Sequence, residues 1–127
     1  MSVFTKEPRE RWIASNEAAF AIYSLFPVTH GHALVVPFRE VPAWWDASPE
    51  ERVAIFRLVD VVKQILDVEL DPDGYNVGFN AGAAAGQTVM HLHVHVIPRF
   101  AGDVPDPRGG IRNVIPGKGW WATQEES

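Results

Sequence analysis

Three histidines at every second position constrain this chain more than any other feature. They occupy the stretch His91-Leu92-His93-Val94-His95-Val96-Ile97. Successive side chains of a β-strand point to opposite faces, so this alternation of imidazole and apolar residues predicts a strand over residues 91–97. On that strand the three imidazoles share one face, and the apolar residues between them pack the other face into a core.

A row of imidazoles has three interpretations. The first is a half-buried strand facing water, but such faces normally carry Thr, Lys, Glu or Ser. The second is a metal site, because imidazole is the commonest metal-binding side chain. At about 3.3 Å per residue, His91 and His95 are about 13 Å apart along the strand. Binding all three histidines to one ion would therefore strain the strand. The third is nucleophilic catalysis, in which one imidazole attacks and its neighbours handle charge and protons.

The loop ahead of the histidines favours nucleophilic catalysis on a phosphate. Gly82 and Gly86 supply flexible backbone, while Gln87 and Thr88 supply an amide and a hydroxyl that suit phosphate oxygens. The loop is not a Walker A motif, because Gln87 stands where that motif has lysine. Glycines are also common in simple tight turns, so this loop indicates phosphate binding only together with the histidines.

The stretch from 91 to 97 resembles the signature of the histidine-triad family, in which three histidines alternate with apolar residues. Residues 86–89 and Pro98-Arg99 resemble the bacterial branch of that family that is like the dinucleoside-polyphosphate hydrolases. Residues 30–37 are similar to the family's Gly-His strand, and residues 19–23 to the strand before it. The resemblance covers residues 11–118, which is nearly the whole chain.

The resemblance implies a catalytic centre of four histidines. His93 would attack the α-phosphorus of a nucleotide and form a covalent nucleotidyl-histidine intermediate that water hydrolyses. Imidazole suits this role because its ordinary pKa, about 6.5, leaves it neutral at cellular pH. The backbone carbonyl of His91 would hold the proton on the other ring nitrogen of His93. His95 would bind phosphate oxygens, with His32 as a neighbour of the triad; the related uridylyltransferases carry glutamine in place of His95, which favours hydrolysis here.

The same matching implies the residues that bind substrate. Phosphate oxygens would be bound by Gln87 and Thr88, with Asn80 on the side of the leaving group. The nucleoside pocket would be formed by Ile22, Tyr23, Ser24, Leu25 and Leu34. Core packing explains the apolar members of this set equally well. Ser24 departs from the family, which has Asp or Asn there for the ribose hydroxyls, so weak binding of ribose is expected.

One long helix and five short strands are predicted. Ser48-Pro49-Glu50-Glu51 is a capping box that starts the helix, and Asp71-Pro72-Asp73-Gly74 is a turn that ends it. Apolar runs predict strands over residues 12–15, 19–24, 32–37 and 75–80, besides the histidine strand. The expected fold is an α+β domain with an antiparallel five-stranded sheet. The resemblance adds a homodimer with a continuous ten-stranded sheet.

Length and composition limit the domain organisation and the function. The 127 residues are expected to form one domain, 1–127, with its core at about 11–100, a polar lead-in over 1–10 and a Pro/Gly-rich tail over 101–127. A net charge of −5 argues against a general nucleic-acid binder. The absence of cysteine excludes disulfides and cysteine-ligated zinc. Without a membrane-spanning run or a signal peptide, a cytoplasmic location without membrane contact is expected.

Three functions therefore remain open. The first is a nucleotidyl hydrolase acting on a dinucleoside polyphosphate or a nucleoside phosphoramidate, which present the same nucleotidyl phosphate. For this function no cofactor or metal site is expected, and magnesium would enter only as a complex with a polyphosphate. The second is a metal-dependent hydrolase built on the histidine row, and the third is a nucleotide-binding regulatory module with little turnover.

Overall fold

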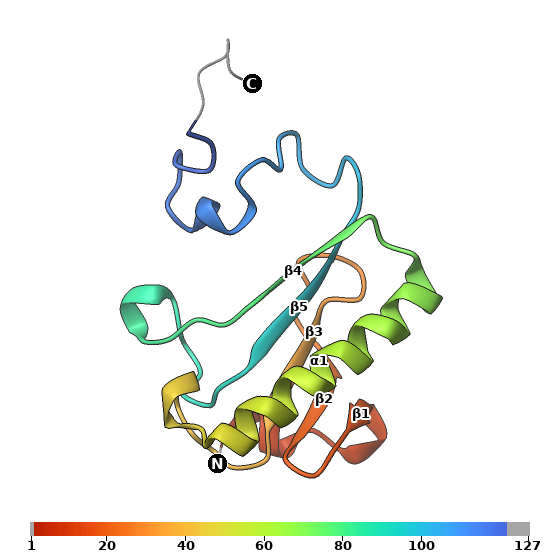
Figure 1. Cartoon of the computed structure of the whole chain (residues 1–127), viewed down its shortest axis with the longest axis vertical. Helices are drawn as coiled ribbons and strands as arrows, with labels where there is room; N and C mark the ends of the chain where they lie inside the picture. Colours follow the sequence, from red (N-terminus) through yellow and green to blue (C-terminus); the bar gives the residue numbers. More distant parts are fainter. Residues whose placement is uncertain (1, 122–127) are drawn as a thin grey trace.

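The computed structural model describes residues 2–121, and in that range one five-stranded sheet carries one long helix on a face (Figure 1). The strands are β1 (Trp12–Ser15), β2 (Ala19–Tyr23), β3 (Ala33–Pro37), β4 (Gly74–Gly78) and β5 (Val94–Arg99), and the helix is α1 (Pro49–Leu70). The sheet order is β1-β2-β3-β5-β4, and every neighbouring pair is antiparallel. The predicted α+β fold is confirmed.

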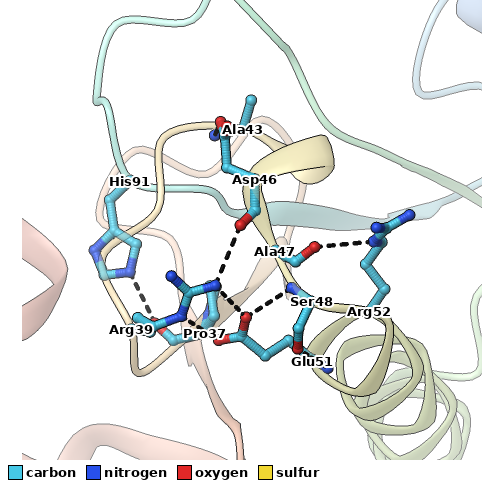
Figure 2. Close-up of polar contacts among 9 residues, drawn as sticks. All are labelled: Pro37, Arg39, Ala43, Asp46, Ala47, Ser48, Glu51, Arg52 and His91. Atoms are coloured by element: carbon cyan, nitrogen blue, oxygen red, sulfur yellow. Dashed lines mark hydrogen bonds and ion pairs between the residues drawn. The ribbon is translucent and has the colours of Figure 1, made fainter.

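The long helix begins and ends where the sequence predicts. The hydroxyl of Ser48 accepts from the backbone N–H of Glu51 at 3.1 Å, and the Glu51 carboxylate accepts from the N–H of Ser48 at 2.8 Å. Asp71 ends the helix with a left-handed φ of 46°. Figure 2 shows that Glu51 also pairs with Arg39, at 2.6 Å, which ties the chain just after β3 to the start of α1.

Each face of the sheet has its own apolar cluster, because side chains alternate along a strand. On one face α1 covers the larger cluster, which includes Ile55, Leu66, Val35 and Val94. The opposite face holds a smaller cluster of Phe4, Phe20, Ile22, Leu34 and Val36. This second face also carries His95, which pairs opposite Leu34, and His93, whose ring packs on Phe4.

The expectation of a polar lead-in over residues 1–10 is wrong for the described residues. Residues 3–6 form a short 3₁₀ helix, η1 (Val3–Lys6), and its Phe4 is only 8% exposed. An aromatic ring removes a large apolar area from water when it is buried, which holds this segment on the sheet. The second core cluster therefore begins ahead of the expected boundary at residue 11.

The last strand is shorter than predicted. β5 begins at Val94, so His91 and His93 precede it, and its pairing with β3 ends at Val35 opposite Val94. Pro37, farther along β3, has no N–H to donate to a ladder. Its carbonyl instead accepts from the ring of His91 at 2.8 Å (Figure 2). At this point the side chain of His91 takes the place of a backbone N–H as the donor to the carbonyl of Pro37.

The described part of the tail, residues 101–121, contains one short helix, η5 (Gly110–Val114). Trp120 and Trp121 pack on each other at 4.3 Å between ring centroids, and Arg108 and Arg112 lie over the two rings. Trp121 is nevertheless 68% exposed. The remaining tail residues, 122–127, lie outside the described part of the chain. Between residues 2 and 121, no helix combines the length and the hydrophobicity needed to cross a membrane.

Candidate active site

His93 presents an unprotonated nitrogen to the open face of the sheet. Its Nδ1 lies 2.8 Å from the carbonyl oxygen of His91, the contact that the family resemblance implies. A carbonyl only accepts, so the proton must be on Nδ1 and the lone pair on Nε2. Burial lowers the pKa of His93, and the hydrogen bond to the His91 carbonyl opposes this only in part. His93 is therefore neutral at pH 7, with its lone pair on Nε2.

His95 presents the opposite kind of atom, an N–H donor. The backbone N–H of Val28 donates to Nδ1 of His32 at 3.1 Å, which places the His32 proton on Nε2. That Nε2 lies 2.9 Å from Nδ1 of His95 and donates to it. The proton of neutral His95 is consequently on Nε2, where it can reach a substrate oxygen. A main-chain amide thus sets the tautomer of a site histidine through one intermediate ring.

Burial keeps these histidines uncharged. It is the main cause of the lowered pKa of His32 and of His95, and the pKa of His95 falls to about 4. Repulsion between the clustered imidazoles lowers both pKa values further. The site therefore offers a lone pair and an N–H side by side without a net charge, with the ring centroids of His93 and His95 5.2 Å apart.

His91 differs from His93 and His95 in its burial and in its hydrogen bonds. It is fully buried at 0% exposure, and both of its ring nitrogens have partners within the protein. Nε2 donates to the carbonyl of Pro37, and Nδ1 lies 2.5 Å from the hydroxyl of Ser2. The alternation of residues 91–97 predicts all three imidazoles on one strand, whereas His91 precedes β5 and its ring is enclosed. What His91 offers to the site is its backbone carbonyl.

Phe4 forms a wall of the site that the sequence did not reveal. Its ring centroid lies 4.9 Å from that of His93 and 5.7 Å from that of His91. It belongs to the same cluster as Ile22 and Leu34. Nothing in a polar N-terminal stretch indicates that its aromatic residue packs on His93, almost ninety residues away.

The five expected nucleoside residues are not brought together. Ile22 and Leu34 lie on the histidine face but are only 3% and 6% exposed, so they act as core residues in this structure. Tyr23 points to the opposite face, where its hydroxyl donates to Glu69 of α1 at 3.1 Å. Leu25 is 57% exposed in the loop after β2.

Ser24 lies at the end of β2, beside His32. Its N–H donates to the carbonyl of His32 at 2.9 Å, and its hydroxyl accepts from the N–H of Phe26 at 3.1 Å. The hydroxyl therefore stabilises the turn after β2, and one hydroxyl proton remains for a ligand. This arrangement is compatible with the weak binding of ribose that the sequence predicts.

The side chain of Gln87 is buried inside the loop before the triad and stabilises it through hydrogen bonds to the backbone. This side chain is 5% exposed, accepts from the N–H of Gly82 at 2.8 Å, and donates to the carbonyls of Pro42 and Val89 at 2.5 and 3.1 Å. Both of its N–H groups are thus used by the loop and not offered to a ligand. Gly82 has a φ of 90°, which only glycine adopts readily. Thr88 and Asn80 are exposed near this loop.

A metal ion has no evident ligand set in the part of the chain that is described. Three or more histidine, aspartate or glutamate side chains are nowhere grouped so that they could hold one ion. Both ring nitrogens of His91 already have protein partners, and His93 and His95 have one free nitrogen each. The free nitrogen of His95 carries a proton, which must leave before this atom can ligate a metal.

A family model described as the HIT domain matches residues 5–102. The chain belongs to the histidine-triad (HIT) family. Within this family it is 41% identical over 83 residues to the asymmetrical bis(5'-nucleosyl)-tetraphosphatase of Schizosaccharomyces pombe, a match covering 65% of this chain and 46% of that protein. It is 35% identical over 92 residues to the AP-4-A phosphorylase of Mycobacterium tuberculosis, covering 72% and 47%. The chain therefore matches about half the length of these two curated relatives.

A solved HIT structure has the same architecture. The NitFhit protein of Caenorhabditis elegans superposes with a TM-score of 0.74 at 35% sequence identity, covering 79% of this chain and 24% of that one. The resemblance that the sequence suggested is thus confirmed for the family and for the fold. The two curated relatives of this HIT protein are named for different reactions, hydrolysis and phosphorolysis.

The pH dependence of the rate should report the neutral state of this cluster. Since the pKa of His93 lies below its ordinary value of 6.5, we expect kcat/KM to fall only when the pH drops below 6.5. kcat/KM should fall toward acid pH because protonation of Nε2 removes the lone pair of His93. The measurement is a kcat/KM profile at constant ionic strength, with His30→Ala, which alters an exposed histidine, as the control. A fall centred above pH 6.5 would mean that the pKa of His93 is raised and not lowered, which would contradict the effect of burial.

Proposed function

We propose that this HIT protein is a nucleotidyl hydrolase that attacks the α-phosphorus of a dinucleoside polyphosphate through His93. The observation that carries the proposal is the pair of free ring nitrogens, a lone pair on His93 and an N–H on His95. The first can form a bond to phosphorus, and the second can donate to an oxygen on the same phosphorus. The substrate class comes from the named activities of the two relatives.

Two displacements at phosphorus account for the reaction. The lone pair on Nε2 of His93 forms a P–N bond, while the P–O bond to the leaving polyphosphate breaks and that oxygen keeps the electron pair. The imidazole becomes positive, and the carbonyl of His91 stabilises its Nδ1–H. Water then attacks the same phosphorus and loses a proton to solvent, and the P–N bond returns its electrons to Nε2. The products are a nucleoside monophosphate and the leaving nucleotide.

The remaining polar residues fit supporting roles in this proposal. Exposed Thr88 and Asn80 would bind oxygens on the phosphate chain and on the leaving side. Gln87, with its amide already used, would hold the loop that positions them. His32 would keep His95 in the donor tautomer. The nucleoside would contact Ser24 and the exposed Leu25, just after β2, more than the buried Ile22 and Leu34.

One panel of substrates tests two points: whether a metal is required, and whether water or phosphate takes the nucleotidyl group from the intermediate. We expect a nucleoside phosphoramidate to be hydrolysed after exhaustive chelation, because its leaving group has no polyphosphate charge that magnesium must neutralise.

Diadenosine tetraphosphate, assayed with magnesium in water labelled with ¹⁸O, should give AMP and ATP, with the label in AMP. The same reaction in millimolar phosphate distinguishes the two named activities, since phosphorolysis would yield ADP in place of AMP.

Each alternative predicts a different result from the same panel. Loss of phosphoramidate turnover on chelation, restored by zinc alone, would replace the proposal with the metal-dependent hydrolase. Tight nucleotide binding with no turnover of any substrate would favour the regulatory module. Phosphate-dependent release of ADP would be consistent with the His93 intermediate, but phosphate and not water would then take the nucleotidyl group from it.

We also propose that two copies pair through β4. This strand is an edge of the sheet, so one side of its backbone has no strand partner among residues 2–121. Exposed apolar residues lie on β4 itself (Val77), on α1 (Val53 and Phe56) and just before α1 (Trp45). Joining two such edges would give a continuous ten-stranded sheet. Analytical ultracentrifugation measures the mass directly, and a monomer at assay concentration would contradict this pairing.

A further inference from the structure

The N-terminal segment reaches the catalytic centre through Ser2. The Ser2 hydroxyl lies 2.5 Å from Nδ1 of His91, although the two residues are 89 positions apart in sequence. The same hydroxyl accepts from the backbone N–H of Phe4 at 3.2 Å, which fixes its orientation. Since Nε2 of His91 donates to the carbonyl of Pro37, its Nδ1 must be the acceptor, and Ser2 is the donor.

This contact acts on the nucleophile through one residue. The ring of His91 is held at both nitrogens, by Ser2 on one side and Pro37 on the other. A ring fixed at two points also restricts the backbone of that residue, and the backbone carbonyl of His91 is the group that accepts the Nδ1 proton of His93. The position of this carbonyl decides whether His93 keeps its lone pair on Nε2.

Pro37 is itself held by its surroundings, whereas Ser2 is held by one short turn. The chain after Pro37 is tied to α1 through the pair of Arg39 and Glu51 (Figure 2). The turn that carries Ser2 packs through Phe4 against His91 and His93. The segment from Ser2 to Phe4 thus contacts both histidines, by a hydrogen bond and by an aromatic ring.

We infer that Ser2 is a positioning residue of the active site, which holds His93 in its nucleophilic tautomer through His91. The inference rests on the proposed attack by His93. Loss of the hydroxyl leaves a buried acceptor of His91 without a donor, and the carbonyl of residue 91 loses its fixed orientation. The effect falls on the chemical step, because Ser2 itself does not contact the substrate.

Three variants test this assignment by kinetics. Ser2→Ala should lower kcat about tenfold with KM within about twofold, the scale expected when a buried acceptor loses its donor. Ser2→Thr, which keeps a hydroxyl, should recover most of the rate. Thr5→Val is the matched control, because Thr5 belongs to the same turn but its hydroxyl is exposed and donates to the carbonyl of Ser2. An equal loss in Thr5→Val would show that only the turn matters and would overturn the inference.

A second readout does not need turnover. Two-bond ¹H–¹⁵N spectra of the imidazole rings report which nitrogen of each histidine carries the proton. We expect His93 to be in the Nδ1–H form in the wild type and to lose part of that population in Ser2→Ala, with no change in Thr5→Val. An unchanged His93 tautomer in a folded Ser2→Ala variant would overturn the inference. If the wild type turned over no substrate, the proposed function would fail while these spectra still tested the positioning role.

Discussion

Replacing His93 with alanine should abolish turnover while nucleotide binding stays within a few-fold of the wild type. The variant loses the only protein atom that forms a bond to phosphorus in the proposed mechanism, so kcat should fall by a factor on the order of 10⁴ or more. Binding should persist because His95 keeps its N–H, which His32 sets independently of His93. The measurements are single-turnover rates and calorimetric titration with a non-hydrolysable nucleotide.

The exposed His30 supplies the matched control, because His30→Ala removes an imidazole of the same size from outside the catalytic row. Its rate should stay near that of the wild type. Acid quenching of the wild type during turnover should also reveal a peptide containing His93 with one nucleotidyl mass added. A His93→Ala protein that kept a tenth of the wild-type rate would contradict covalent catalysis at this residue.

Ile55→Ala should lower the free energy of unfolding by about 2–5 kcal/mol, the range for large-to-small substitutions in a packed core. Ile55 lies on α1 at 0% exposure and belongs to the cluster between the helix and the sheet. Its truncation removes apolar contacts and leaves a cavity between α1 and the sheet. Urea unfolding followed by tryptophan fluorescence measures the change.

Val68 provides the control on the same helix. It is 87% exposed, so Val68→Ala should change the free energy of unfolding by no more than about 0.5 kcal/mol. The same small change in Ile55→Ala would mean that α1 does not close the core of the folded protein in solution. A loss of stability in Val68→Ala similar to that of Ile55→Ala would point to a helix surface covered by a partner.

The helix was predictable because its signals are local. The capping box at Ser48 and the turn after Asp71 act over three or four residues, and the structure confirms both ends. The start of β5 was not predictable, because it depends on Pro37, a residue more than fifty positions earlier, whose carbonyl takes the ring of His91. Periodicity gave the face on which His93 and His95 lie, but it could not show that His91 is buried.

The nucleoside residues illustrate a limit of motif matching. Ile22 and Tyr23 are consecutive in a strand, so alternation alone requires that they face opposite sides of the sheet. The structure accordingly directs Tyr23 to Glu69 on the helix side. Ser2 and Phe4 could not have been found from sequence, since neither belongs to a motif and their partners lie near the other end of the chain. Their roles depend on the tertiary fold.

The hydrogen-bond chain from Val28 through His32 to His95 runs in one direction only. For the proposed substrate this has a stereochemical consequence. The two non-bridging oxygens of a nucleotide α-phosphate are diastereotopic, because ribose is chiral, and a site distinguishes them when it donates a hydrogen bond to only one. Here a lone pair approaches from one ring and a hydrogen is offered from a neighbouring ring, so one oxygen receives the donor and the other does not. The choice between the two oxygens would then depend, through His32 and His95, on the main-chain N–H of Val28.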